Sequence, residues 1–442
     1  MGMEYKEQLL EKTISEIQKQ VRINSIRDIK HQEEGKPFGP GVDNAFDQFI
    51  SLANELGLDT FKDPEGYYAY AEIGPKDAEM VGILAHVDTV DVGDLSMWTE
   101  AGPFSGDVVD GKIIGRGSLD DKGPLVINLM ALGELIKSGY EFRKRIRVIV
   151  GGAEETTWQG IKKYIKEQEI PAMGYSPDAN FPLIHGEKGH LQFRVTTTGS
   201  NEFSITTNNS INAVCDKVIY QGANVDTLVD SIKDATIVED SMVVSGKSAH
   251  AMECFKGDSA INKLVNSLDT NHPLIVFVKK YLTDIYGNDI LPDTQNEEMR
   301  LNIGNMIINE DKGYIEVDMR FPLGIDGQPL VDKIESTVKE NGLEWELIKF
   351  QKELYLEETH PLVTTLLGVY NEVTNENAKP LTTGGGTYAR AFDNCLAFGM
   401  VFTSQNMIDN MHQPNECLEV KFIMPALEIY AKAIVALDNL TI

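Results

Sequence analysis

The sequence predicts an α/β protein: a domain with a mixed central sheet flanked by helices, plus an inserted α+β domain. Apolar strand-like runs alternate with amphipathic helical segments from residue 4 to about 190, which is the pattern of a sheet covered by helices. From residue 191 to about 354 the pattern changes to the two-residue alternation of half-buried strands. A chain of 442 residues is also too long for one core and suits two or three domains.

The first segment is expected to alternate helices and strands. Helices are expected over residues 4–20, 43–56, 124–138 and near 159–168, and strands over YYAYAEI (67–73), MVGILAHV (80–87) and RIRVIVGG (145–152). Pro124 suits the start of a helix, and Gly139 suits its end. Functional groups are expected where the strands of such a sheet end.

The middle segment, 191–354, has apolar content of its own and reads as strands with a few helices, such as 258–269 and 329–342. After it, amphipathic helices over 360–376 and 415–440 flank the strand LAFGMVF (396–402). The first domain is therefore expected to comprise residues 1–190 and 355–442, with 191–354 inserted into it.

Composition argues against several classes of partner. The formal charge is −28, from 40 Lys and Arg against 68 Asp and Glu, and such a surface repels nucleic acid and anionic membranes. No apolar run reaches the ~18 residues of a membrane span, and the charged segment MGMEYKEQLLEK lacks a signal-peptide core. Four cysteines without CxxC spacing suggest reduced thiols. A cytoplasmic location is expected.

Acidic residues and histidines gather at the expected strand ends. They are His86 and Asp88 in HVDTV, Asp120 and Asp121 in GSLDDKG, Glu154 and Glu155 in GGAEETT, and Asp178 in YSPDAN. A further candidate ligand, His412 in NMHQPNE, lies far downstream, before a Pro-containing turn and the last expected helix. A solvated loop is the plain alternative for the glutamate pair, and helix capping is the alternative for the aspartate pair. If these ends converge, the crowded carboxylates need a cation. Oxygen and imidazole donors without thiolate suit Zn²⁺, Mn²⁺ or Co²⁺, and so many carboxylates suit two ions sharing a bridge.

The sequence resembles the dinuclear zinc-dependent aminoacylase, carboxypeptidase and dipeptidase family, and within it the PepV-type bacterial dipeptidases. The matching motifs, in order, are HVDTV, IIGRGSLDDKGPL, GGAEETTWQGI, YSPDANFP, HGEKG, GKSAHA, GGGTYAR and MHQPNE. The resemblance implies two metal ions, with zinc favoured and manganese the alternative. It assigns one ion to His86 and Asp178, the other to Glu155 and His412, and the bridge to Asp120. It makes Glu154 the general base, Asp88 the residue that orients His86, and the Asp120–Asp121 peptide cis.

The resemblance also makes 191–354 a lid domain over a catalytic one, with a plausible hinge near its two joints. It implies that His250 in GKSAHA stabilises the oxyanion and that Asn212 contributes to substrate binding, although Cys215 stands where the family has proline. Arg320, and less specifically Arg390, could bind a substrate carboxylate. The turn at Gly385 could offer backbone N–H groups to the same carboxylate. The remaining histidines, His31, His185, His190, His272 and His360, are read as structural.

The leading functional hypothesis is a metallodipeptidase that hydrolyses unblocked dipeptides. A deacylase of N-acyl amino acids uses the same chemistry, and a non-catalytic binding protein is the alternative from another class. The motifs DDKGP and GGGTYAR favour the dipeptidase. Side-chain preference and the choice between monomer and homodimer are not specified by the sequence.

Overall fold

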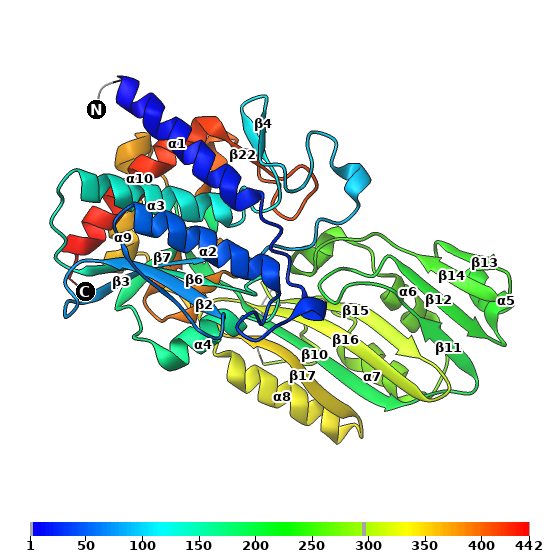
Figure 1. The fold of residues 1–442 in the computed structure, drawn as a ribbon. Helices are drawn as coiled ribbons and strands as arrows, with labels where there is room; N and C mark the ends of the chain where they lie inside the picture. The colour runs from blue at the N-terminus through cyan, green and yellow to red at the C-terminus, as the bar shows by residue number, and fades with distance from the viewer. Residues whose placement is uncertain (1–2, 294–297, 442) are drawn as a thin grey trace. The chain divides into compact units, whose positions relative to one another are not determined.

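The computed structural model describes residues 3–293 and 298–441, and the chain divides into two compact units (Figure 1). Unit 1 comprises Met1–Gly186, Leu356–Thr382 and Gly386–Ile442, and unit 2 comprises Glu187–Tyr355 with Thr383–Gly385. The short segment 383–385 had been expected in the first domain. It associates with unit 2 because Lys188 N–H donates to the carbonyl of Thr383 and Arg320 Nη1 donates to the carbonyl of Gly384.

The central sheet of unit 1 is mixed, as predicted. Its strands run in the order β1 (Asp59–Lys62), β2 (Tyr68–Ile73), β6 (Arg145–Gly151), β3 (Met80–His86), β7 (Met173–Ser176), β20 (Cys395–Ala397) and β9 (Ile184–Glu187). Strands β6, β3, β7 and β20 are parallel, whereas β1, β2 and β9 pair antiparallel with their neighbours. Both β3 and β6 are buried along their whole length, which explains why they read as continuous apolar runs.

Helices lie on both faces of this sheet. They are α1 (Met3–Val21), α2 (Pro40–Glu55), α3 (Lys122–Lys137), α4 (Gln159–Glu167), α9 (Pro361–Thr374) and α10 (Ile423–Asn439). The chain steps from β3 to β6 in one direction across the sheet and from β6 to β7 in the other. Since parallel crossovers are right-handed, α3 and α4 must lie on opposite faces, as Figure 1 shows. None of the helices within 3–293 and 298–441 has the length and apolar character of a membrane span.

Two expectations for the C-terminal segment were wrong. The run LAFGMVF is two strands, β20 and β21 (Met400–Phe402), because the chain turns at Gly399, which has φ +83° and precedes a cis peptide bond. Residues 415–440 do not form one helix, because the segment begins with β22 (Cys417–Glu419) and α10 starts only at Ile423. Strand β21 pairs with β8 (Ala179–Phe181), and β22 joins β5 (Lys112–Ile114) and β4 (Asp107–Val109).

Unit 2 is built on an eight-stranded antiparallel sheet, which agrees with its two-residue alternation. The order is β13 (Ala235–Val238), β14 (Ser241–Ser245), β12 (Lys217–Gly222), β11 (Phe203–Thr206), β15 (Arg300–Ile308), β16 (Lys312–Phe321), β10 (Gly189–Thr198) and β17 (Glu344–Gln351). Its helices are α5 (Val225–Leu228), α6 (Ala260–Ser267), α7 (Pro273–Tyr281) and α8 (Gly327–Glu340). The two short remaining strands, β18 (Leu354–Tyr355) and β19 (Leu381–Thr383), are not part of this sheet; both come next to β9 in the strand order of the first sheet. Each unit has its own apolar core.

Candidate metal centre

The parallel strands of unit 1 bring three polar segments to one edge of the sheet. His86 ends β3 and lies opposite Gly151, the last residue of β6, in the strand register. Glu154 and Glu155 follow β6 directly, and Asp178 follows β7. Because the carboxyl ends of parallel strands share one edge, residues far apart in sequence become neighbours there.

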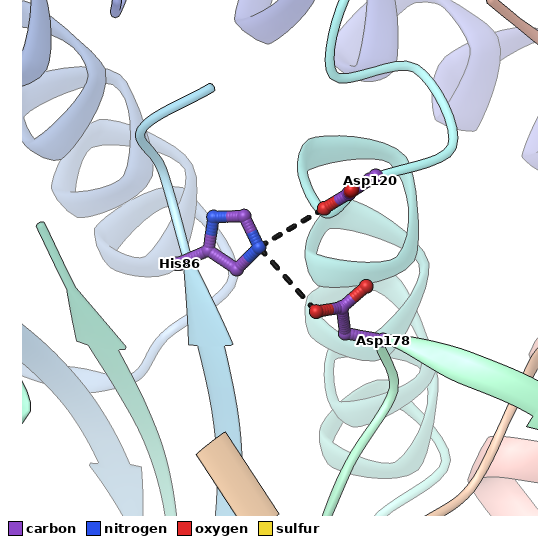
Figure 2. A group of neighbouring side chains, drawn as sticks. All are labelled: His86, Asp120 and Asp178. Carbon is purple, nitrogen blue, oxygen red and sulfur yellow. Dashed lines mark ion pairs between the residues drawn. The ribbon is translucent and has the colours of Figure 1, made fainter. Parts of the chain in front are cut away.

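One group of possible metal ligands consists of His86, Asp120 and Asp178 (Figure 2). His86 Nε2 lies 3.1 Å from Asp120 Oδ1 and 3.5 Å from Asp178 Oδ2. All three side chains are buried or nearly so. His86 Nε2 and Asp120 Oδ1 have no hydrogen-bond partner among the described residues, which leaves one nitrogen and one oxygen available to a cation.

A second group shares Asp120 and adds Glu155 and His412. His412 Nε2 lies 2.9 Å from Asp120 Oδ2 and 3.1 Å from Glu155 Oε1. Asp120 therefore presents one carboxylate oxygen to each group. This arrangement is what a carboxylate that bridges two ions requires.

The charges at this edge fit a pair of divalent cations. Burial, and then the carboxylate of Asp120, raise the pKa of Asp178 to about 6 and that of Glu155 to about 7. Hydrogen bonds to Asp120 and Glu155 raise the pKa of His412 to about 11. Carboxylates crowded out of water in this way are stabilised by cations. Oxygen and imidazole donors without a thiolate suit Zn²⁺ or Mn²⁺.

Asp88 holds both His86 and the glutamate pair in place. The ring nitrogen Nδ1 of His86 lies 3.0 Å from the backbone carbonyl of Asp88, which can only accept, so Nδ1 carries the proton. In the neutral ring Nε2 then has the free lone pair that a metal needs. The Asp88 carboxylate is farther from the ring, at 3.6 Å, and instead accepts the backbone N–H groups of Glu154 at 3.0 Å and Glu155 at 3.2 Å.

Glu154 is a carboxylate at this edge that belongs to neither ligand group. It is buried, and burial raises its pKa well above the ordinary value. The turn that carries it has two non-glycine residues in the left-handed region, Ala153 at φ +63° and Trp158 at φ +60°. Strained backbone of this kind is found mostly at functional sites.

Asp121 belongs to neither ligand group, but it supports the backbone of His86. Its buried carboxylate accepts the backbone N–H of His86 at 3.2 Å. It occupies the N-cap position of α3 but makes no side-chain capping bond, so the capping alternative was wrong for this residue. The Asp120–Asp121 peptide is cis, as the resemblance implied.

Tyr388 is a residue near the site that the sequence did not single out. It is buried in the helical turn η5 (Tyr388–Ala391), with its ring centroid 6.2 Å from that of His86 and 5.2 Å from that of Trp158. Its hydroxyl has no hydrogen-bond partner within the described part of the chain. Its neighbour Arg390 is only partly buried and lies against Gly386. The only signal for Tyr388 in the sequence was its place within the GGGTYAR motif.

Unit 2 contains His250, Asn212, Arg320 and Gly385. His250 and Asn212 are neighbours: an isolated bridge pairs Ala213 with His250, and the carbonyl of Asn212 accepts the N–H of Ala251 at 2.8 Å. His250 also caps the helical turn η4 (Ala251–Lys256) through its ring, which accepts the N–H of Met252. Cys215, which replaces the family's proline, is buried in the core of unit 2.

Arg320 is buried in a polar network of unit 2. Its Nε donates to Asp318 Oδ1 at 2.9 Å, and its Nη1 donates to the carbonyl of Gly384 at 3.0 Å. His190, interpreted from the sequence as structural, lies 2.8 Å through Nε2 from Asp318 Oδ2. The N–H of Gly385 donates to Thr383 Oγ1 at 3.1 Å. The sequence around His190 did not indicate this network, because Asp318 and Arg320 are 128 and 130 residues away along the chain.

The other histidines belong to neither ligand group. His31 pairs with Asp28, His185 Nδ1 lies 2.7 Å from the carbonyl of Leu356, and His360 caps α9. His272 packs edge-on against Phe203. These contacts agree with structural roles.

Comparisons with known proteins extend over nearly the whole chain. Residues 82–436 match Peptidase family M20/M25/M40. A "Putative dipeptidase" of Staphylococcus epidermidis is 31% identical over 98% of this chain and 98% of its own length. Among solved structures, human carnosine dipeptidase 1 superposes with a TM-score of 0.63 at 12% identity, covering 99% of this chain and 98% of its own. An M20 family metallo-carboxypeptidase of Sulfolobus solfataricus gives 0.62 at 14% identity, covering 97% and 99%. At these identities the two structures establish the fold.

Proposed function

Since this chain belongs to peptidase family M20/M25/M40, we propose that it is a metal-dependent dipeptidase that hydrolyses unblocked dipeptides of L-residues. The observation that carries the proposal is the division of the Asp120 carboxylate between two ligand groups, one with His86 and Asp178 and the other with Glu155 and His412. The dipeptidase name of the Staphylococcus relative supports the substrate class.

In this proposal His86 and Asp178 hold one ion, Glu155 and His412 hold the other, and Asp120 binds both. When bound there, such ions would supply Lewis-acid chemistry, which polarises a scissile carbonyl and makes an attacking water more acidic. Zinc is the proposed ion and manganese the alternative, because the same donors accept either.

Glu154 is the proposed general base. It takes the proton of the attacking water and passes it to the leaving amine. Burial raises the pKa of Glu154 above its ordinary value, which makes the carboxylate a stronger base for this proton transfer. The Asp88 carboxylate accepts the backbone N–H of Glu154 and so holds its backbone.

Unit 2 is the proposed source of the remaining substrate contacts. We assign stabilisation of the oxyanion to His250 and substrate contact to Asn212, whose backbone meets the His250 segment. Arg320 is the proposed partner of the substrate carboxylate, and its rigid attachment to Asp318 supports a fixed guanidinium. Gly385 of unit 2 and Arg390 of unit 1 are proposed as secondary contacts.

The partners and location are part of the proposal. The net charge of −28 supports a small peptide substrate over nucleic acid or an anionic membrane. Four free, buried cysteines suit the cytoplasm. Either a monomer or a homodimer is compatible with this function.

The test measures dipeptide hydrolysis by metal-stripped protein before and after Zn²⁺ or Mn²⁺ is added, for the wild type and Glu154→Gln. The wild type is expected to recover activity at two ions per chain. The variant is expected to bind two ions and to lose at least about 10²-fold in kcat, because an amide cannot accept the proton. Full activity of Glu154→Gln would overturn the assigned base.

A matched pair of substrates separates the dipeptidase from the deacylase. A free dipeptide and the N-acetylated form of its C-terminal residue present the same carboxylate and a comparable scissile amide, but only the dipeptide has a free amine. Preference for the acetylated compound identifies a deacylase. No hydrolysis of either compound by protein with two bound ions identifies a non-catalytic member.

A further inference from the structure

Glu416 is a buried carboxylate that belongs to neither ligand group. It follows His412 by four residues and is fully buried. Its Oε1 accepts the backbone N–H groups of Gly117 at 2.9 Å, Leu119 at 3.0 Å and Asp120 at 3.2 Å. The side chain of one ligand loop thus binds the backbone of another, immediately at the residue shared by both ligand groups.

Arg116 completes this connection. Its Nη1 donates to Glu416 Oε2 at 2.7 Å and to the carbonyl of Gln413 at 3.2 Å, directly after His412. Its Nη2 donates to the carbonyl of Asp91 at 3.2 Å. The guanidinium also lies 5.4 Å from the ring of Trp98. The buried guanidinium of Arg116 therefore joins two segments. One follows β3 and contains Asp91, and the other precedes β22 and contains Gln413.

The backbone around His412 depends on such contacts. His412 has φ +63°, a left-handed conformation that a non-glycine residue keeps only when its surroundings fix it. The N–H of Gly115 donates to the carbonyl of Glu416 at 2.9 Å, and β22 pairs with β5 just beyond. The His412 loop is thus tied to the segment that leads into Asp120.

The contacts require a carboxylate at position 416. One oxygen accepts three N–H groups and the other accepts the guanidinium, so every neighbour is a donor. A glutamine would direct its NH₂ group toward one of these donors. The charge of Glu416 is compensated by Arg116, and removal of one member of such a buried pair leaves the other without its partner.

We propose that Glu416, together with Arg116, is a positioning residue that sets the spacing between Asp120 and His412 and so determines the affinity for the ion of the Asp120, Glu155 and His412 group. The inference rests on the proposed metal centre. It concerns ion affinity, however, and is tested without turnover.

The test is a titration of metal-free protein with Zn²⁺ in competition with a chromophoric chelator. The wild type is expected to bind two ions. Glu416→Gln is expected to bind one of its two ions about 10- to 100-fold less tightly than the wild type does, which is the usual effect of removing a residue that supports a metal ligand. In Glu416→Gln, hydrogen exchange at the amides of Gly117, Leu119 and Asp120 should be faster than in the wild type. Exchange at the amides of β6 should be less affected.

Asp438→Asn is the matched control. Asp438 is also a buried carboxylate that accepts backbone N–H groups, from Arg143 and Lys144, but these precede β6 at the opposite edge of the sheet from His86. This variant is expected to lose stability and to bind both ions as the wild type does. A loss of ion affinity equal to that of Glu416→Gln would show a general structural effect and overturn the proposal.

Arg116→Lys provides a second variant should Glu416→Gln not fold. Lysine keeps the charge but cannot reach Glu416, Gln413 and Asp91 together, so weaker binding of the second ion is expected. Wild-type affinity for both ions in the folded variants would overturn the positioning role. If the wild type binds two ions but hydrolyses no dipeptide, the proposed function fails while the titration still decides the role of Glu416.

Discussion

Asp88 shows how much of the site depends on single buried residues. Its backbone carbonyl holds the His86 ring, and its carboxylate accepts two amides of the glutamate turn. The sequence spacing suggested a carboxylate that orients the histidine. In the structure the backbone carbonyl of Asp88 lies 3.0 Å from His86 Nδ1 and its carboxylate lies 3.6 Å from the same nitrogen. The carboxylate also accepts the backbone N–H groups of Glu154 and Glu155.

Replacement of Asp88 by asparagine should therefore affect the glutamates more than His86. The amide NH₂ group would face one of the two N–H donors, and kcat for dipeptide hydrolysis should fall about 10- to 100-fold. Steady-state kinetics with two ions bound measures this. Asp94→Asn is the control, because Asp94 also accepts a backbone N–H but lies on an exposed turn of the same segment. Wild-type kcat in Asp88→Asn would contradict the assignment.

Gly151 and Tyr388 should be energetically coupled. A Cβ atom at residue 151 would lie 2.5 Å from the Tyr388 hydroxyl and 2.8 Å from its ring. Gly151→Ala should destabilise the protein by about 1–3 kcal/mol through overpacking. Tyr388→Phe should cost little, because the buried hydroxyl has no hydrogen-bond partner in the described residues.

The double variant is expected to recover part of the lost stability, since only the closest contact is removed. Free energies of unfolding in urea for all four proteins give the coupling. Strictly additive losses would show that the alanine is accommodated elsewhere.

At the level of elements, β10 and β16 are joined by a buried polar network as well as by their backbone pairing. His190 on β10 and Arg320 on β16 both bond Asp318. Burial lowers the pKa of His190 to about 4, although Asp318 opposes the shift. The histidine is thus neutral in the folded protein over a range in which it is protonated when unfolded.

This depressed pKa predicts a loss of stability in acid. Between about pH 6.5 and pH 4 the unfolded state binds more protons, so stability is complete above pH 6.5 and falls as the pH approaches 4, by up to about 3 kcal/mol. His190→Gln should flatten this dependence, because glutamine does not titrate. Native-state hydrogen exchange of β10 amides measures it. His31→Gln, on the surface of unit 1, is the control, and an unchanged slope in His190→Gln would refute the prediction.

The same scale shows where sequence reasoning succeeds. Helices α1, α4 and α8 and strands β3 and β6 lie close to their predicted positions because each has a clear apolar period or run. The prediction of a single strand over LAFGMVF was wrong because an apolar run does not reveal the turn at Gly399 within it. The strand β22 was missed because its three residues stand only a few residues before the long apolar helix α10.

For the whole molecule, the sequence could indicate which residues gather but not how they are supported. Three ligand candidates, His86, Glu155 and Asp178, end or closely follow apolar parallel strands, and such strand ends meet by topology. Glu416 and His190 act through backbone amides and buried partners over 100 residues away, and such contacts leave no spacing pattern in one chain. The association of 383–385 with unit 2 likewise depends on two long-range hydrogen bonds.

All five proposed ligands lie in unit 1, so bound metal should stabilise that unit alone. An ion that binds only the folded state adds about 2.7 kcal/mol when its free concentration is 100 times its Kd. Amides of β3, β6 and β7 should then exchange about 100-fold more slowly with Zn²⁺ or Mn²⁺ than with EDTA, while amides of β15 and β16 keep their rates. A chain of net charge −28 also attracts cations nonspecifically, and that effect would slow exchange in both units. Ionic strength is therefore matched with NaCl, and Asp120→Asn, which removes the shared ligand, should abolish the difference between the units. Equal protection of both sheets, or protection that persists in Asp120→Asn, would place the bound metal outside this centre.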